Sequence, residues 1–283
     1  MVIIIKGVER DRRRNSLRDI AGQADLRYDD LTLGGAQHLM ESIYALRNHE
    51  RFGRSSGGGL YRMWLQVVKH GCQMAKAVRK ERFDLLLDEL PQAFCWYSGF
   101  CSLLDIKLDD IVWQFFPYVC PTCYKERCVC GTEKDHRPRK RQKDPKLLAK
   151  FRRLNAKRRP STLNDYVKMF GKIYGAHADS VNMQGIFLHF TEELGEVAEE
   201  IDQSRRSVRK EGISYALRGE LADVFSWIAK LCWKANSYSV GLLKSPASTD
   251  QISLAALIRA RYGNGCPDCG RRTCTAQCSG WIR

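Results

Sequence analysis

Residues 186–201 read IFLHFTEELGEVAEEI, and residues 217–231 read LRGELADVFSWIAKL. In both stretches, apolar side chains recur every three or four residues, which places them on one face of an α-helix. Neither stretch shows the alternation of apolar and polar residues that is typical of a half-buried strand. The sequence therefore predicts two amphipathic helices that pack against each other in an antiparallel, all-α bundle.

An internal repeat extends this pattern to the first half of the chain. Stretches such as LMESIYALRNHE and LYRMWLQVVKHGCQMAKAV come in the same order as their counterparts in the second half, and each set is followed by a cysteine-rich segment. The matched positions include Ile43 with Ile173, Tyr44 with Tyr174, Glu89 with Glu220, and Cys120 with Cys266. We expect two copies of one helical unit, each of which ends in a cysteine-rich segment, joined by a basic linker.

Eight of the twelve cysteines lie in two compact groups, each of which reads C-P-x-C-x4-C and ends in a fourth cysteine. In a cytosolic chain, thiolates at this spacing more often bind Zn²⁺ than form disulfides. We predict structural zinc, with reduced thiols, a redox pair and ligands pooled between the groups as alternatives. The predicted ligands are Cys120, Cys123, Cys128 and Cys130 in one group, and Cys266, Cys269, Cys274 and Cys278 in the other. The remaining cysteines, Cys72, Cys95, Cys101 and Cys232, lie in apolar helical stretches and are predicted core residues.

The positive charge of the chain is concentrated in one segment. The sequence has 47 Lys and Arg against 32 Asp and Glu, a net charge of +15, and residues 131–160 hold 13 basic and 3 acidic residues. This composition predicts a flexible basic linker that runs into a short helix around Leu147 to Leu154. The linker is either a solvated connector or a surface that contacts the phosphates of nucleic acid or another acidic partner.

Apolar stretches are too short to cross a membrane. The longest uncharged candidate, Pro91 to Leu104, has 14 residues, whereas a bilayer needs about 20. The apolar start at Val2 to Ile5 has only four residues before the first charge, which argues against a signal peptide. We expect a cytoplasmic protein without a membrane partner.

Carboxylates lie opposite the apolar stripes of the two amphipathic helices. On the first helix, Glu193 and Glu196 are one turn apart and Glu192 lies beside them, and Glu220 and Asp223 are similarly spaced on the second. Two packed acidic faces repel each other unless a cation lies between them. Oxygen ligands without nearby His or Cys favour Mg²⁺ or Mn²⁺. The alternative is a solvated acidic surface.

The pattern E-E-x-x-E, a gap of 23 residues and E-x-x-D resembles the signature of the MazG-like all-α nucleoside triphosphate pyrophosphohydrolases. The resemblance covers residues 162–240 and includes the apolar framing of both motifs. It implies hydrolysis of a nucleoside triphosphate to the monophosphate and pyrophosphate. It also implies that Glu193, Glu196, Glu220 and Asp223 coordinate Mg²⁺, and that Glu192 and Glu193 take part in catalysis by supporting the cluster or orienting water.

A stripe of side chains on the second acidic helix extends the predicted site toward substrate. Glu220, Asp223, Trp227, Lys230 and Lys234 follow each other at spacings of 3, 4, 3 and 4 residues. We predict that Lys230 or Lys234 contacts the distal phosphates and that Trp227 flanks the base. Asn236 stands where the family often has an asparagine near the substrate. Solvated lysines and a packing tryptophan are the alternatives.

The first half lacks the acidic pattern. Lys69, His70 and Gln73 stand in place of the three glutamates, Gln92 replaces Asp223, and only Glu89 is retained. This half should not bind two Mg²⁺ ions. The resemblance implies that it is a degenerate partner of the catalytic half and forms an internal pseudo-dimer with it, because one subunit commonly completes the site of another in this superfamily. Two alternatives stay open: Lys69 or His70 neutralises the vacated pocket, or His70 acts as a catalytic base.

These predictions divide the chain into five parts. A degenerate MazG-like unit spans residues 1–118, a zinc module 119–131, the basic linker 132–160, the catalytic MazG-like unit 161–262, and a C-terminal zinc module 263–283. A different class of function competes with the enzyme, namely a zinc-containing, nucleic-acid-binding regulator whose acidic bundle is structural. Further homo-oligomerisation stays open.

Overall fold

The computed structural model describes residues 31–53, 58–130, 143–180, 182–207, 213–242 and 253–278, apart from the side chains at 83–84, 176–180, 204–207 and 236–242. Every regular element in these ranges is a helix and no strand occurs among them, which confirms the predicted all-α class. No helix in the described ranges combines the length and apolar character that a membrane span requires. The start of the chain, residues 1–30, and the first part of the basic linker, residues 131–142, lie outside the described residues.

The described part of the first half contains the helices α2 (Leu33–Phe52), α3 (Gly59–Arg79), α4 (Phe83–Leu103) and α5 (Leu108–Phe115). The hydroxyl of Thr32 caps α2 by accepting a hydrogen bond from the Gly35 amide at 2.8 Å. Helices α3 and α4 pack against each other, and α2 packs on α4. The helix α4 continues through Pro91.

The second half has the same order of elements after the short helix α6 (Pro145–Leu154), where the sequence predicted a helix. Its helices are α7 (Leu163–Ser180), α8 (Met183–Ser207), α9 (Tyr215–Leu242) and α10 (Leu254–Tyr262). Helix α8 packs on α9, and α7 packs on α9. The two predicted amphipathic stretches therefore form the central pair of this half.

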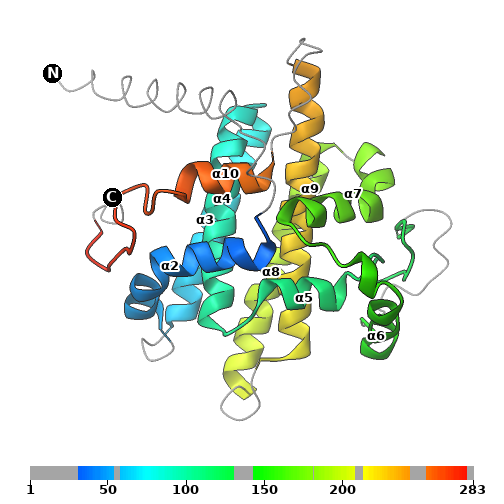
Figure 1. Ribbon diagram of the computed structural model, residues 1–283, viewed down its shortest axis with the longest axis horizontal. Coiled ribbons are helices and arrows are strands. Elements are labelled where there is room, and N and C mark those ends of the chain that lie inside the picture. Colours follow the sequence, from blue (N-terminus) through cyan, green and yellow to red (C-terminus); the bar gives the residue numbers. More distant parts are fainter. Residues whose placement is uncertain are drawn as a thin grey trace.

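The last helix of each half lies on the other half (Figure 1). Helix α5 packs on α9, and α10 packs on α4. The halves also share one apolar core, in which the Phe94 and Phe225 rings meet with centroids 6.4 Å apart. The Trp64 indole donates a hydrogen bond to the Leu194 carbonyl at 3.0 Å. Each half thus completes the core of the other.

The cysteine-rich loops are exchanged in the same way. The Cys128 amide donates to the Ile173 carbonyl at 2.7 Å, and the Cys274 amide donates to the Ile43 carbonyl at 2.6 Å. Cys128 and Cys274 are the third cysteines of the two groups, and Ile43 and Ile173 are matched positions of the repeat. The two hydrogen bonds therefore join equivalent positions in opposite directions.

Candidate functional site

An acidic cluster lies on the seam between α8 and α9. Burial of the apolar stripes, which include Leu194 and Leu221, holds the helices together and brings the flanking carboxylates to one side. One carboxylate oxygen each of Glu193, Glu196 and Glu220 can be chosen so that all three lie within 4.8 Å of one another. The predicted residues of two separate helices thus converge, with Asp223 next to them.

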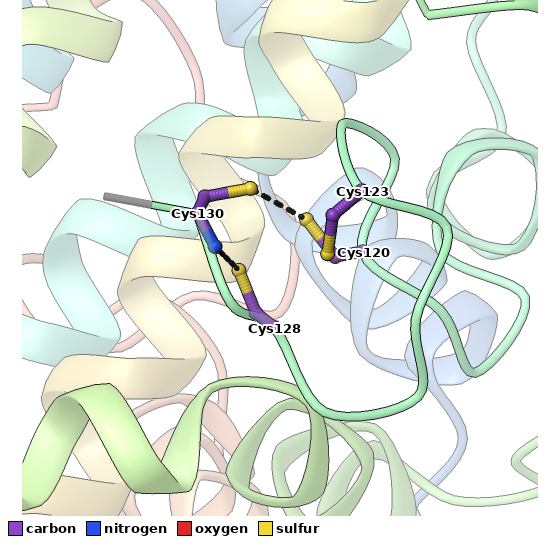
Figure 2. Close-up of side chains that lie close together, drawn as sticks. All are labelled: Cys120, Cys123, Cys128 and Cys130. Carbon is purple, nitrogen blue, oxygen red and sulfur yellow. Dashed lines mark hydrogen bonds between the residues drawn. The ribbon is translucent and has the colours of Figure 1, made fainter. Parts of the chain in front are cut away.

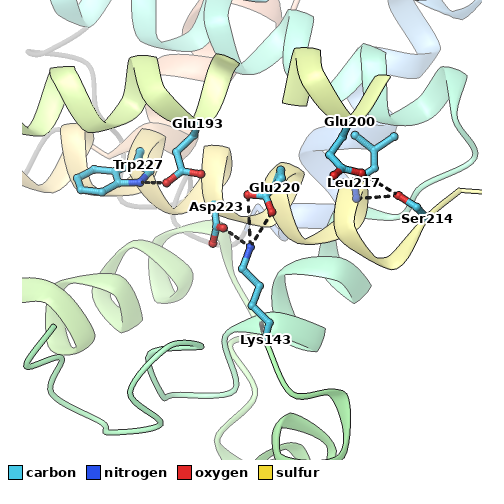
Figure 3. Close-up of polar contacts among 8 residues, drawn as sticks. All are labelled: Lys143, Glu193, Glu200, Ser214, Leu217, Glu220, Asp223 and Trp227. Carbon is cyan, nitrogen blue, oxygen red and sulfur yellow. Dashed lines mark hydrogen bonds and ion pairs between the residues drawn. The ribbon is translucent and has the colours of Figure 1, made fainter. Parts of the chain in front are cut away.

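A lysine from the basic linker enters this cluster (Figure 3). The Nζ atom of Lys143 lies 3.4 Å from Glu220 Oε1 and 3.5 Å from Glu220 Oε2, and it also donates to Asp223 Oδ2. The sequence predicted that a cation would separate the acidic faces, but it did not identify Lys143 as that cation. One sequence signal near Lys143 could have been used. Asp144 caps α6 and Pro145 is its first residue, so the chain is fixed directly after Lys143.

The electrostatics of the cluster show an excess of negative charge. Burial and the charges of Asp223 and Glu196 raise the pKa of Glu193 to about 9, and burial and the charge of Glu220 raise the pKa of Asp223 to about 6. Burial acts to lower the pKa of Lys143, but the charges of Asp223 and Glu220 outweigh it and raise that pKa. One ammonium group therefore does not neutralise the carboxylates.

Glu193 has one oxygen available within the cluster. Its Oε1 atom accepts a hydrogen bond from the Trp227 indole at 3.1 Å (Figure 3). Its Oε2 atom is buried and accepts no hydrogen bond from the described residues. A buried carboxylate oxygen without a donor is unfavourable unless a proton or a cation compensates it. The donor set of this site, made only of oxygens, fits a hard divalent cation such as Mg²⁺.

Glu192 lies outside the cluster. Its Oε2 atom is 2.7 Å from Nδ1 of His189, and its side chain is 56% exposed. The His189 ring stacks on Trp227 with centroids 5.1 Å apart. Glu192 is therefore directed to the solvent at the edge of the site, whereas the sequence placed it beside the catalytic carboxylates.

The other predicted substrate contacts follow α9 away from the acidic cluster. Lys230 is buried, with its Nζ atom 4.1 Å from the centroid of the Trp227 ring and 5.3 Å from that of Tyr174. Burial lowers the pKa of Lys230 to about 8. Lys234 is half-buried one turn further on, and Asn236 falls outside the residues whose side chains are described.

The first cysteine group gathers at one point (Figure 2). The Sγ atoms of Cys120 and Cys130 are 3.7 Å apart, and the Cys130 amide donates to Cys128 Sγ at 3.4 Å. All four Sγ atoms, including that of Cys123, lie within 4.8 Å of one another. Tetrahedral zinc with Zn–S bonds of about 2.3 Å requires Sγ atoms about 3.8 Å apart. The closely spaced Cys128 and Cys130 thus reach one common centre.

The second cysteine group repeats this geometry. Its Cys266 and Cys278 Sγ atoms are 3.9 Å apart, and all four Sγ atoms again lie within 4.8 Å. The tight turn is also the same, because Gly270 donates to the Cys266 carbonyl as Tyr124 donates to that of Cys120, both at 2.8 Å. Gly270 and Tyr124 both adopt a positive φ, at 68° and 59°. Each group is therefore complete by itself and could hold one zinc ion.

The predicted core role of the other cysteines is correct for three of them. Cys95, Cys101 and Cys232 are buried, but Cys72 is exposed. Helix α3 buries the stripe that includes Val67, Gly71 and Met74, and position 72 points away from it. The prediction for Cys72 was wrong because proximity to an apolar stretch does not place a residue on its buried face.

The first half has no carboxylate cluster in its described part. His70 Nδ1 lies 2.9 Å from Glu89 Oε2, and the Gln92 amide donates to the Asp88 carbonyl at 3.0 Å. No group of three potential metal ligands other than the cysteines of the first loop forms among these described residues. This half pairs its retained glutamate with a histidine.

Several basic side chains after Lys143 contact the protein itself. Arg152 donates to the Gln114 carbonyl at 2.9 Å, Arg158 pairs with Glu126 at 2.6 Å, and Arg159 pairs with Asp110 at 3.2 Å. These contacts fix α6 and the following turn against α5 and the first cysteine loop. Part of the basic segment is thus ordered by intramolecular contacts.

A scan of protein-family models and searches of the curated proteins and of the solved structures found no match to this chain. Its function must therefore be argued from the geometry of its own residues.

Proposed function

We propose that the chain is a Mg²⁺-dependent nucleoside triphosphate pyrophosphohydrolase. The observation that carries this proposal is the convergence of Glu193, Glu196 and Glu220 from two helices within 4.8 Å. The raised pKa values of Glu193 and Asp223 support it, because they indicate that a single lysine leaves the cluster short of positive charge. An enzyme that binds a triphosphate through a divalent cation needs such a concentration of oxygen ligands.

The metal ligands in this proposal are Glu193, Glu196, Glu220 and Asp223. Mn²⁺ would suit the same oxygens. Mg²⁺ bound there would neutralise the triphosphate and lower the pKa of a bound water molecule. Glu193 presents its buried Oε2 atom to the cluster, and the Trp227 indole fixes the orientation of its carboxylate through Oε1.

Lys143 acts in this proposal as a phosphate-binding residue. In the structure its ammonium group is held by Glu220 and Asp223, which are also proposed metal ligands. A divalent cation at these carboxylates would repel the ammonium group, and the phosphates of the substrate would then provide its new partners. Lys143 is better placed for this contact than Lys230, whose ammonium group lies against two aromatic rings.

The remaining predicted roles follow from position. Trp227 donates a hydrogen bond to Glu193 and would flank the base, and the His189 ring is stacked on its indole. Glu192 pairs with His189 at the exposed edge, so we assign it a supporting role at the entrance rather than contact with the metal. Lys234 and Asn236 lie further along α9 and would contact the outer part of the substrate.

The proposal is tested with a panel of ribo- and deoxyribonucleoside triphosphates and Mg²⁺, with release of monophosphate and pyrophosphate as the readout. We expect Glu193→Gln and Asp223→Asn to abolish release while the helical content is retained. Glu199→Gln, which changes an exposed glutamate on the same helix, is the matched control and should stay active. Full activity in both site variants, or no pyrophosphate release from the unmodified protein with any of the nucleotides, would overturn the proposal.

We further propose that each cysteine group binds one structural zinc ion and that the two halves form a tandem, internally pseudo-dimeric pair of MazG-like units. The Sγ distances support the first point. The reciprocal hydrogen bonds of Cys128 and Cys274 support the second.

A nucleic-acid-binding function is the second candidate, and one observation favours it. Lys146, Lys150, Arg153 and Lys157 are all exposed and follow each other at spacings of 4, 3 and 4 residues along α6 and the turn after it. Such a stripe could contact successive phosphates. This function predicts salt-dependent retention of DNA or RNA that survives Glu220→Ala but is lost when Lys146, Lys150 and Arg139 to Arg141 are neutralised.

A further inference from the structure

Cationic side chains of both halves line one cavity. It has a volume of about 160 Å³ and lies where α2, α3 and α4 meet α10 and the second cysteine loop. The lining residues that matter here are Arg47, Lys69, His70, Trp96, Arg261 and Asp268. We propose that this cavity is a metal-independent binding site for a phosphate group.

The charges that face the cavity favour an anion. Arg47, Lys69 and Arg261 line it, against Asp268 as the only carboxylate among the described lining residues. Two nearby carboxylates, those of Asp88 and Glu89, do not line the cavity and are already paired. Asp88 Oδ1 lies 2.6 Å from Arg261 Nη1, and Glu89 Oε2 lies 2.9 Å from His70 Nδ1. These pairs fix the orientation of Arg261 and His70, and the three cations Arg47, Lys69 and Arg261 leave the surface of the cavity positive.

Arg261 has a donor for which the described residues provide no acceptor. Its Nε atom is buried and makes no hydrogen bond within the described part of the chain. A buried guanidinium donor normally has an acceptor, because leaving it unsatisfied is unfavourable. A phosphate oxygen in the cavity would be such an acceptor, in the geometry by which arginine commonly binds phosphate.

Arg47 is built into the wall rather than exposed on the surface. It is 3% exposed, and its guanidinium carbon lies 4.0 Å from the centroid of the Tyr44 ring and 4.8 Å from that of Trp96. Contacts with two aromatic faces hold a guanidinium group in one orientation. A buried, positioned arginine and an unsatisfied arginine donor therefore line the same cavity.

The size of the cavity limits the ligand. A single water molecule needs roughly 10–15 Å³, whereas pockets for drug-sized molecules have about 300–1,000 Å³. The observed volume therefore suits a phosphate or pyrophosphate group and is too small for a whole nucleotide. The ligand is either the free anion or the phosphate end of a nucleotide whose remainder lies outside.

The cavity stands at the position in the first half that corresponds to the acidic cluster in the second. His70 matches Glu193, Gln92 matches Asp223, and Trp96 matches Trp227 in the repeat. The substitutions reverse the charge, so this site would bind phosphate directly and not through a metal ion. The inference rests on the cavity itself and stands whether or not the acidic cluster is catalytic.

Isothermal titration of the full chain with inorganic phosphate, pyrophosphate and a nucleoside monophosphate tests the proposal. The buffer contains neither added Mg²⁺ nor a chelator, since a chelator would remove zinc. We expect saturable binding of at least one of the three ligands. Comparison of phosphate and pyrophosphate with the monophosphate shows whether the site takes the free anion or the phosphate of a nucleotide.

Variants assign the binding to this cavity. Arg261→Gln should weaken binding by about tenfold or more, and Lys69→Gln by a smaller factor, because each removes a charge-assisted contact. Lys76→Gln, an exposed change elsewhere on α3, should leave binding unchanged. If Arg261→Gln does not fold, Lys69→Glu provides the same test at an exposed position.

The outcomes separate this site from the acidic cluster. Glu193→Gln and Asp223→Asn should bind phosphate as the unmodified protein does, whatever their effect on hydrolysis. Absence of binding in the unmodified protein at millimolar ligand overturns the proposal. Equal affinities in the unmodified protein, Lys69→Glu and Arg261→Gln would do so too.

Discussion

Lys143 and Asp223 form a direct ion pair although 80 residues separate them in the sequence. The lysine comes from the segment with the highest density of positive charge, and the aspartate from the helix that carries the proposed metal ligands. The pair therefore links the basic linker to the candidate site. The effect of this ion pair on the stability of the protein can be measured with and without Mg²⁺.

Lys143→Gln should make the stability of the protein depend more strongly on Mg²⁺. Without the ammonium group the buried carboxylates lose their internal counter-charge, which should lower the free energy of unfolding by about 1–3 kcal/mol in the absence of Mg²⁺. Each kcal/mol corresponds to a decrease in Tm of roughly 2–4 °C. Thermal unfolding should show a larger rise in Tm on addition of Mg²⁺ for this variant than for Lys146→Gln, an exposed control. An identical rise in both variants contradicts a shared site for the lysine and the metal.

Without Mg²⁺, the stability of the protein should fall as the pH rises. The pKa values of Glu193 and Asp223 are raised to about 9 and about 6 in the folded state, so the folded protein binds more protons than the unfolded chain above a pH of about 4. The stabilisation is fully present below the unfolded pKa values and is lost as the pH rises through the folded ones, with a slope of up to about 1.4 kcal/mol per pH unit for each group. Urea denaturation from pH 5 to pH 9 measures this slope.

Glu193→Gln should flatten that pH profile, because a glutamine does not titrate. Glu199→Gln on the exposed side of the same helix should leave the profile unchanged. A profile that keeps its full slope in Glu193→Gln would show that the pKa of Glu193 is not raised.

Purified protein should contain about two zinc ions per chain, one for each cysteine group. Cys120→Ser and Cys266→Ser should each lose one ion and lower the Tm, whereas Cys72→Ser, a change at an exposed cysteine, should keep both. Elemental analysis of fresh protein, purified without a chelator, measures the number of zinc ions per chain. A complete absence of zinc in such protein refutes both sites.

Phe225→Ala should destabilise the whole chain by about 3–5 kcal/mol. The Phe225 ring is fully buried and contacts Phe94 of the first half as well as Tyr166 and Phe170 of the second. Because these contacts join the halves, denaturant unfolding should stay a single transition at a lower midpoint. Leu188→Ala, at a side chain that is 62% exposed, is the control for loss of an apolar residue. Two separate transitions in Phe225→Ala would show that the halves unfold independently.

The amino-acid sequence was sufficient to predict the helical class and the pairing of α8 with α9, because the apolar period is set by residues on the same helix. It also predicted which cysteines gather, since the C-P-x-C turn is local. The convergence of Glu193 and Glu220 followed from two facing helical periods. Their roles in hydrolysis stay predictions.

Contacts between segments that are distant in the chain could not be predicted from the sequence. Lys143 was interpreted as part of a flexible linker, because nothing local shows that the chain after it packs on α5 through Arg152 and on the first cysteine loop through Arg158. Glu192 pairs with His189 three residues earlier on the same helix, and its side chain is exposed, whereas the sequence placed it beside the catalytic carboxylates. The contacts of Lys143 and of the chain after it depend on tertiary packing.

The exchange of the cysteine loops between the halves has a consequence for biosynthesis. Cys274 supplies the donor for Ile43, and the Ala276 amide binds the Glu50 carboxylate across 226 residues of chain. When the first half leaves the ribosome, the partner of its helix α2 has not yet been translated. This surface of the nascent first half therefore stays uncovered until residue 276 has been synthesised. Because surface that is exposed during folding promotes aggregation, we expect a chaperone to bind the first half during translation.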